Sequence, residues 1–238
     1  MAIVKLMTML IVLMTIVTAC GGGSESAGLD KDMAVADVLQ HASDRLAETE
    51  SMRFNLDVDG KTVIDASGAM QLLGAKGVMA RPNKVDVEFR IRALGAQTLS
   101  IRMITIGGDS WTTDIVTGKW IDAPDEFGYN PAVLYDNQNG LGPVMGKLED
   151  ARVDGIETVD GRETYHVTGS ASQGVIRPLT SGAMKGNPVG VQLWIDGETW
   201  DLLKIVVSEP DNSGNDDPAT WTMTLSDHNK KVDIEPPV

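Results

Sequence analysis

A strict alternation of apolar and charged residues runs along Val85-Asp86-Val87-Glu88-Phe89-Arg90-Ile91-Arg92. Successive side chains of a β-strand point to opposite faces, so this stretch predicts a strand with one apolar face and one charged face. Such a strand belongs in an antiparallel sheet that has one face covered and the other in water. The stretch therefore decides the class of fold.

The same period of two recurs in both directions along the chain. Its apolar members are Met52, Phe54, Leu56 and Val58; Leu99, Ile101 and Met103; Trp111 and Ile115; Tyr165 and Val167; Leu193 and Ile195; Leu203, Ile205 and Val207; and Trp221, Met223 and Leu225. Three pairs suited to short hairpins lie between runs, namely Thr117-Gly118, Asp160-Gly161 and Asp196-Gly197. Residues 210–218 are polar and rich in turn formers, which predicts a loop between the last two strands.

Three segments depart from this alternation and predict helices. Residues 30–50 place their apolar side chains on one helical face, at Val35, Val38, Leu39, Ala42 and Leu46. Residues 131–148 contain Pro and several Gly, and predict two short helical pieces or one kinked helix. Residues 171–188 predict a short helix followed by a loop. The chain is therefore expected to have an α+β fold built on an antiparallel sheet.

The chain begins with an apolar run that ends at its single cysteine. Lys5 precedes this run, residues 6–17, and Val17-Thr18-Ala19-Cys20 then follows the pattern of a lipobox. The run is shorter than the roughly 20 residues of a membrane span and matches the core of a secretory signal. We expect residues 1–19 to be removed and Cys20 to be acylated, with chains such as palmitate; an ordinary signal peptide with an incidental Cys is the alternative. Residues 20–28 would then be a Gly/Ser tether, and residues 29–238 one folded domain.

Charge and motif spacing exclude several classes of function. The formal net charge of −14 argues against a nucleic-acid partner, which needs a basic stripe for phosphates. Gly108-Asp109-Ser110 superficially resembles an esterase nucleophile motif, but His41, His166 and His228 show no motif partner for it. No His pair has ligand spacing, and no carboxylate run has the calcium-loop pattern. We therefore expect no enzyme activity, no metal and no cofactor.

The predicted interior is rich in methionine and tryptophan. The chain has five Trp, and six methionines are expected across the sheet and its covers, namely Met70, Met79, Met103, Met145, Met184 and Met223. Methionine adapts to irregular shapes, and a curved sheet covered by a few broken helices can leave an apolar pocket for acyl chains. A plain packed core has the same composition, so composition leaves both interpretations open.

Several segments taken together resemble the LppX/LprG group of mycobacterial cell-envelope lipoproteins. They are the lipobox and tether, Tyr129-Asn130-Pro131-Ala132-Val133-Leu134, Asn139-Gly140-Leu141, Leu148-Glu149-Asp150-Ala151, residues 155–161, Tyr165-His166-Val167-Thr168-Gly169, Asn187-Pro188-Val189, residues 191–195, Met223-Thr224-Leu225-Ser226 and Pro236-Pro237-Val238. The similarity spans nearly the whole chain after the predicted cleavage site, in the expected order.

This resemblance implies a strongly curved, U-shaped antiparallel half-barrel over residues 29–238, with a few helices on the concave face enclosing a hydrophobic cavity. It also implies an exported lipoprotein, anchored to the cell membrane on its extracytoplasmic side. Such a protein binds acylated lipids or glycolipids and carries them within the cell envelope, with a membrane lipid transporter as a further partner. The alternative is a filled-core envelope lipoprotein that acts as a protein-interaction or sensory module.

Our hypothesis for the lipid-binding residues combines one sheet wall with one lid. The sheet wall would be Val85, Val87, Phe89, Ile91, Leu99, Ile101 and Met103. The lid would be Leu134, Leu141, Val144 and Met145.

Overall fold

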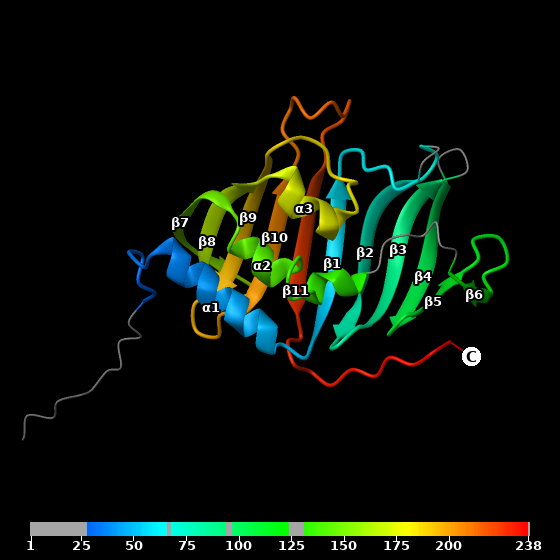
Figure 1. The fold of residues 1–238 in the computed structure, drawn as a ribbon, viewed down its shortest axis with the longest axis horizontal. Helices are drawn as coiled ribbons and strands as arrows, with labels where there is room; N and C mark the ends of the chain where they lie inside the picture. Colours follow the sequence, from blue (N-terminus) through cyan, green and yellow to red (C-terminus); the bar gives the residue numbers. More distant parts are fainter. Residues whose placement is uncertain (1–27, 66–67, 94–96, 124–130, 238) are drawn as a thin grey trace, which may run out of the picture.

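The computed structural model describes residues 28–65, 68–93, 97–123 and 131–237 (Figure 1). The predicted signal peptide, Cys20 and the tether up to residue 27 lie outside these residues. Within them, no helix combines the length and the apolar character needed to cross a membrane.

One antiparallel sheet of eleven strands forms the body of the molecule. Its strands are β1 (Ser51–Asp59), β2 (Gln71–Ala80), β3 (Lys84–Ala93), β4 (Gln97–Ile106), β5 (Asp109–Thr113), β6 (Trp120–Asp122), β7 (Glu149–Val159), β8 (Arg162–Ala171), β9 (Val189–Asp196), β10 (Leu202–Ser208) and β11 (Thr220–Ser226). Their spatial order is β6-β5-β4-β3-β2-β1-β11-β10-β9-β8-β7. The first and last strands therefore pair at the centre of the sheet, while β6 and β7 lie at opposite edges.

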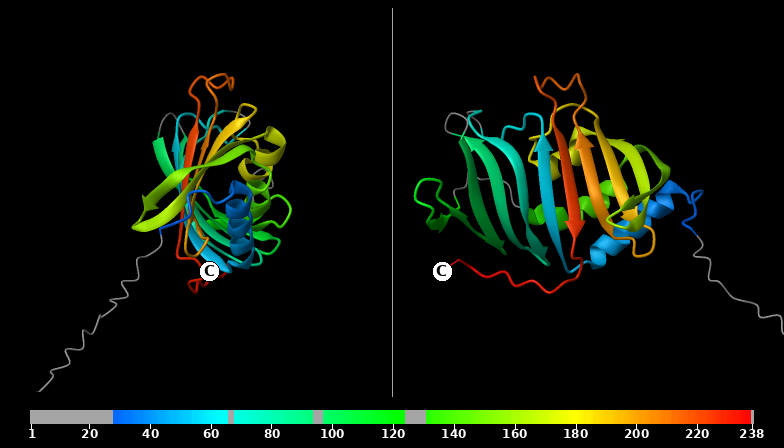
Figure 2. Two further views of the ribbon diagram at one scale, coloured as in Figure 1. Left: turned by 90° about the vertical axis from the view of Figure 1, so that its left-hand side faces the viewer. Right: turned by 180° about the vertical axis from the view of Figure 1, so that it is seen from behind.

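The helices lie on one side of a curled sheet (Figures 1 and 2). They are α1 (Val35–Glu48), α2 (Leu141–Met145), α3 (Gln173–Thr180) and the 3-10 helix η2 (Pro131–Tyr135). Because η2 and α2 belong to the connection from edge strand β6 to edge strand β7, the chain carries them across the concave face. Register shifts in β2, β7 and β10 add local bend to the natural twist of the strands. The predicted α+β half-barrel with helices on its concave side is confirmed.

The alternation in β3 sorts its side chains between the two faces as predicted. Val85, Val87 and Ile91 are buried on the concave side, whereas Arg90 and Arg92 are exposed on the convex side. Neighbouring strands keep the register, since Val87 lies opposite Met103 of β4. Apolar rows of adjacent strands therefore share one face.

The two interrupting segments also form as predicted. Residues 131–148 contain two short helical pieces, η2 and α2, and residues 171–188 contain the short α3 and then a loop. The polar segment 210–218 lies between β10 and β11. The first helix is shorter than the predicted range 30–50, because residues 30–33 form a turn in which the Met33 amide donates to the Asp30 carbonyl.

The placement of Ile115 on a strand was wrong. The strand ends at Thr113, and Ile115 lies in the following turn with 40% of its surface exposed. The cause is Asp114, whose carboxylate accepts hydrogen bonds from the backbone amides of Val116 and Thr117 and from the Thr117 hydroxyl. Aspartate that bonds to the backbone two or three residues ahead builds a turn instead of extending a strand.

Candidate functional site

The eleven residues predicted to bind lipid all belong to one apolar region on the concave side. Nine are buried members of a single core cluster, with exposed fractions from 0% to 7%: Val85, Val87, Ile91, Ile101, Met103, Leu134, Leu141, Val144 and Met145. Phe89 and Leu99 are partly buried and pack against that cluster. The structure thus brings the sheet wall and the lid together; contact with lipid remains a prediction.

Strand pairing sets the sheet wall of this region. Phe89 of β3 lies opposite Ile101 of β4, and Ile91 lies opposite Leu99. Directly opposed residues of an antiparallel pair point to the same face, which makes the wall continuous across the two strands.

The lid packs against both the sheet and the other helices. η2 lies against β3 and α3, and α2 lies against α1. Gly142 allows this close approach, since a Cβ atom there would lie 3.1 Å from the Ser43 hydroxyl oxygen on α1. The lid is therefore held through contacts with its neighbours, not by its own short helices alone.

The predicted lipid-binding set left out the other half of the concave face. Leu39 and Leu46 of α1 and Ile176 and Leu179 of α3 are buried in the same cluster. This cluster extends over β8 to β11, where Val167, Leu193 and Ile205 are buried. The helical spacing of residues 35–46 predicted an apolar helix face, but nothing local showed which strands that face covers.

This apolar region is closed in the structure. A side chain that lines open space exposes surface to a water-sized probe, whereas the nine buried residues expose 7% or less. Two hollows border the convex face instead: one of about 430 Å³ beside Arg53, Lys76 and Arg102, and one of about 520 Å³ beside Arg152 and His166.

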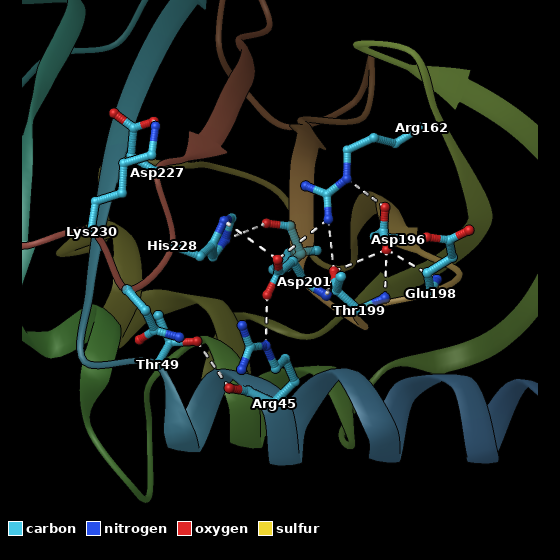
Figure 3. Close-up of polar contacts among 12 residues, drawn as sticks. Arg45, Thr49, Arg162, Asp196, Glu198, Thr199, Asp201, Asp227, His228 and Lys230 are labelled. Carbon is cyan, nitrogen blue, oxygen red and sulfur yellow. Dashed lines mark hydrogen bonds and ion pairs between the residues drawn. The ribbon is translucent and has the colours of Figure 1, made fainter.

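An ionic cluster fastens α1 to one end of the sheet (Figure 3). Asp201, in the loop before β10, accepts a hydrogen bond from Arg45 Nε of α1 at 2.7 Å. Arg162 of β8 contacts both carboxylates of this loop, with its Nε 2.6 Å from Asp196 Oδ2 and its Nη2 3.4 Å from Asp201 Oδ2. The carboxylates expose only 4% and 8% of their side chains, so they depend on these partners. We call Arg45, Arg162, Asp196 and Asp201 the α1 clamp.

His228, in the segment after β11, faces the α1 clamp. Its Nδ1 lies 3.9 Å from Asp201 Oδ2, and its Nε2 lies 3.2 Å from the Leu202 carbonyl oxygen. Burial lowers the pKa of His228, and the nearby Asp201 charge opposes this only in part. Burial acts to raise the pKa of Asp201, but the hydrogen bond from Arg45 and the other partners outweigh it and hold that pKa below its ordinary value.

Trp200 adds an aromatic contact beside the α1 clamp. Its ring stacks on His41 of α1 with centroids 4.7 Å apart, and on Tyr165 of β8 with centroids 5.7 Å apart. Its φ of +63° is uncommon for a bulky residue, so the surrounding contacts hold it there. Helix α1 is thus attached to the sheet by both charge and stacking.

Residues 34–234 match the model of the LppX_LprAFG lipoprotein family. The chain belongs to this family. It is 25% identical over 226 residues to the lipoarabinomannan carrier protein LprG of Mycobacterium tuberculosis, covering 94% of this chain and 91% of that protein. It is 24% identical to the LprG of Mycolicibacterium smegmatis, covering 99% of this chain and 96% of that protein.

Solved structures of two family members share the fold. LprF from Mycobacterium bovis superposes with a TM-score of 0.66 at 19% identity, covering 85% of this chain and 96% of that chain. LppX from Mycobacterium tuberculosis superposes with a TM-score of 0.60 at 15% identity, covering 86% of this chain and 100% of that chain. The resemblance to the LppX/LprG group is therefore confirmed.

The other residues considered from the sequence lie apart from the apolar region's lid. The Ser110 hydroxyl lies 2.9 Å from the Thr105 hydroxyl on the neighbouring strand. His166 sits on the convex face, with Nδ1 2.9 Å from Glu157 Oε1 and its ring stacked on Trp194. Across the part of the chain that the structure describes, no group of three His, Cys, Asp or Glu side chains could hold a metal ion.

Proposed function

We propose that this member of the LppX_LprAFG family carries acylated lipids or glycolipids on the concave apolar face, with residues 29–238 as one lipid-binding domain. The observation that supports it best is a single apolar cluster that contains the wall of β3 and β4 together with residues of the short helices η2 and α2, with η2 in contact with β3. The name of the relative LprG, a lipoarabinomannan carrier protein, supports the same class of ligand.

A carrier is needed because moving acyl chains from a bilayer into water costs a large free energy. Each buried methylene contributes about 0.8 kcal/mol, so a sixteen-carbon chain resists leaving a bilayer by something on the order of 10 kcal/mol. Two or three such chains do not cross water unaided. A concave apolar face that replaces the contacts of the bilayer removes most of that barrier.

In this proposal the closed region opens at η2 and α2. The α1 clamp and Trp200 attach α1 to the sheet. No ion pair among the described residues attaches η2 or α2, although Arg81 lies over the Tyr135 ring of η2 at 4.5 Å, and α2 is flanked by Gly140 and Gly146. Acyl chains would enter between these helices and the wall of β3 and β4. The lipidated Cys20 would anchor the protein to the extracytoplasmic side of the membrane, with a membrane lipid transporter as its partner.

The closed packing supports a second candidate function. Because the predicted lining residues expose 7% or less of their surface, the same fold would also serve as a filled-core lipoprotein that binds another protein. This candidate needs no movement of the lid.

Native mass spectrometry separates the two candidates. The chain carrying Cys20→Ser, which cannot be acylated, would be purified and its lipids extracted. A carrier retains about one acyl lipid per protein, lost on denaturation. A mass that stays free of lipid after incubation with mixed lipid vesicles would overturn the carrier proposal in favour of the interaction module.

Bulky substitutions test the placement of the ligand. Val87→Trp and Val144→Trp fill the wall and the lid, and are expected to reduce lipid uptake while unfolding remains cooperative. Overpacking costs about 1 to 3 kcal/mol of stability. Val78→Trp is the matched control, because Val78 lies on β2 opposite the outward-facing Asp86 of β3. Unchanged uptake in both test variants would contradict the placement.

A further inference from the structure

The Tyr135 hydroxyl is a buried donor without a partner. Among the described side chains it is one of two buried polar atoms that make no hydrogen bond, the other being Thr168 Oγ1. Tyr135 ends η2, directly after the lid residue Leu134, and only 5% of its surface is exposed. Buried polar groups in folded proteins are nearly always hydrogen-bonded. A hydroxyl left without a partner inside a lid therefore suggests that its partner is not part of the protein.

The Arg81 guanidinium lies over the same aromatic ring and has N–H groups without a hydrogen-bond partner among the described residues. The Arg81 guanidinium carbon is 4.5 Å from the centroid of Tyr135. Arg81 donates to three backbone carbonyls: to Thr49 at 2.9 Å, to Leu46 at 3.0 Å and to Tyr135 itself at 3.4 Å. A guanidinium has five N–H groups, so two remain. No carboxylate of the described residues lies within ion-pair distance of it.

Both groups can donate hydrogen bonds, and the guanidinium cannot accept one. Burial raises the pKa of the Tyr135 hydroxyl far above its ordinary value, with Arg81 opposing and Glu50 assisting. The phenol therefore keeps its proton, which remains available for a hydrogen bond. A pair of donors at the edge of an apolar cluster suits an oxygen atom that accepts hydrogen bonds.

We propose that Tyr135 and Arg81 form a polar subsite that binds a hydrogen-bond-accepting oxygen of the lipid close to its glycerol. The oxygen could belong to an ester carbonyl or to a headgroup phosphate. This inference rests on the proposed carrier function. The chain of the same lipid would lie along the apolar cluster that contains Leu134 and Tyr135.

Tyr135→Phe tests the subsite, because it removes one oxygen atom and keeps the ring. Binding would be measured with the Cys20→Ser chain and three probes: ester-linked dipalmitoylglycerol, ether-linked dihexadecylglycerol and ether-linked dihexadecyl phosphatidic acid. We expect about a tenfold loss of affinity for the ester-linked probe if the carbonyl is the acceptor. A loss for the ether-linked phosphatidic acid identifies the phosphate instead. Affinity for dihexadecylglycerol should not change.

Thermal unfolding of the lipid-free variant gives an independent readout. Removing an unsatisfied hydroxyl should leave the Tm unchanged or raise it. Tyr165→Phe is the matched control, because Tyr165 is also buried in the core cluster and its hydroxyl, unlike that of Tyr135, is not among the buried polar atoms without a partner. The control should lower the Tm and affect the three probes equally.

Two results would overturn the subsite, and they differ from failure of the carrier function. If the unsubstituted protein binds lipid and Tyr135→Phe binds all three probes as tightly, the subsite alone is wrong. A lower Tm for lipid-free Tyr135→Phe would show that the hydroxyl is already satisfied within the protein. If the unsubstituted protein binds none of the probes, the carrier function and the subsite fail together.

Discussion

Replacing Asp201 by Asn tests whether the α1 clamp stabilises the fold. The substitution keeps the shape of the side chain and removes the charge that faces Arg45, Arg162 and His228. A hydrogen bond to a charged group contributes about 1.5 to 3 kcal/mol. Arg45 exposes 30% of its side chain, so water recovers part of the loss. Arg162 retains its contacts with Asp196 and Thr199. We therefore expect Asp201→Asn to lower the free energy of unfolding by about 2 kcal/mol.

Urea denaturation followed by circular dichroism measures this loss. The matched control is Asp227→Asn, which removes an exposed carboxylate that pairs with Arg53 at 3.3 Å and Lys230 at 2.7 Å. Asp227 has a φ of +56°, a conformation that Asn also accepts. Water screens ion pairs that are as accessible as these, so the control should lose clearly less stability than Asp201→Asn.

A double-mutant cycle with Arg45→Met isolates the contact between the helix and the loop. We expect a coupling energy of about 1 to 2 kcal/mol, within the range for residues in contact. The reasoning is refuted if Asp201→Asn loses no more stability than Asp227→Asn, or if the coupling energy is within about 0.5 kcal/mol of zero.

Two further predictions concern pH and backbone packing. Burial holds the pKa of His228 below 6.5, so below pH 6.5 the unfolded chain binds more protons than the folded chain. The contribution of His228 to stability should therefore be complete above pH 6.5 and be lost as the pH falls through the folded pKa. His228→Gln should flatten this part of the plot of urea-measured stability against pH, and an unchanged slope would contradict the assignment. Asp201, whose pKa lies below 3.8, should add a separate loss only as pH falls through that lower value. In β2, a methyl group at Gly77 would overlap the backbone oxygen of Asp86, whereas one at Gly190 in β9 would lie 3.8 Å from the nearest atom. Gly77→Ala should therefore cost about 1 to 3 kcal/mol in urea unfolding and Gly190→Ala should not, and equal stabilities would show that the strands shift freely.

Local patterns predicted much of the sheet because strand faces and turns depend on neighbouring residues. The period of two along β3 identified both of its faces, and Asp160-Gly161 identified the turn between β7 and β8. The pattern did not reveal β2, since Gly74 and Gly77 interrupt its alternation. Their neighbours explain these glycines: a Cβ atom at either position would overlap a backbone oxygen of an adjacent strand.

One part of the candidate site could be predicted from the sequence and another could not. The apolar wall and lid could be predicted, because buried strands and short helices have a characteristic spacing of apolar residues along the chain. The α1 clamp could not, because Arg45 and Asp201 are 156 residues apart and neither belongs to a motif. No local pattern marked Tyr135 either, because the lack of a hydrogen-bond partner for its hydroxyl among the described residues depends on which side chains surround η2.

The sequence by itself determined the class of fold, the positions of its two broken helical segments and the family resemblance. These follow from the alternation of side chains, from glycine and proline, and from motifs that are read along the chain. Only the tertiary structure decided that the first and last strands pair at the centre of the sheet, that the concave face is closed and that α1 is clamped at one end. Each of these depends on contacts between residues far apart in the chain, and the burial and charge of such contacts are set by packing rather than by sequence neighbours.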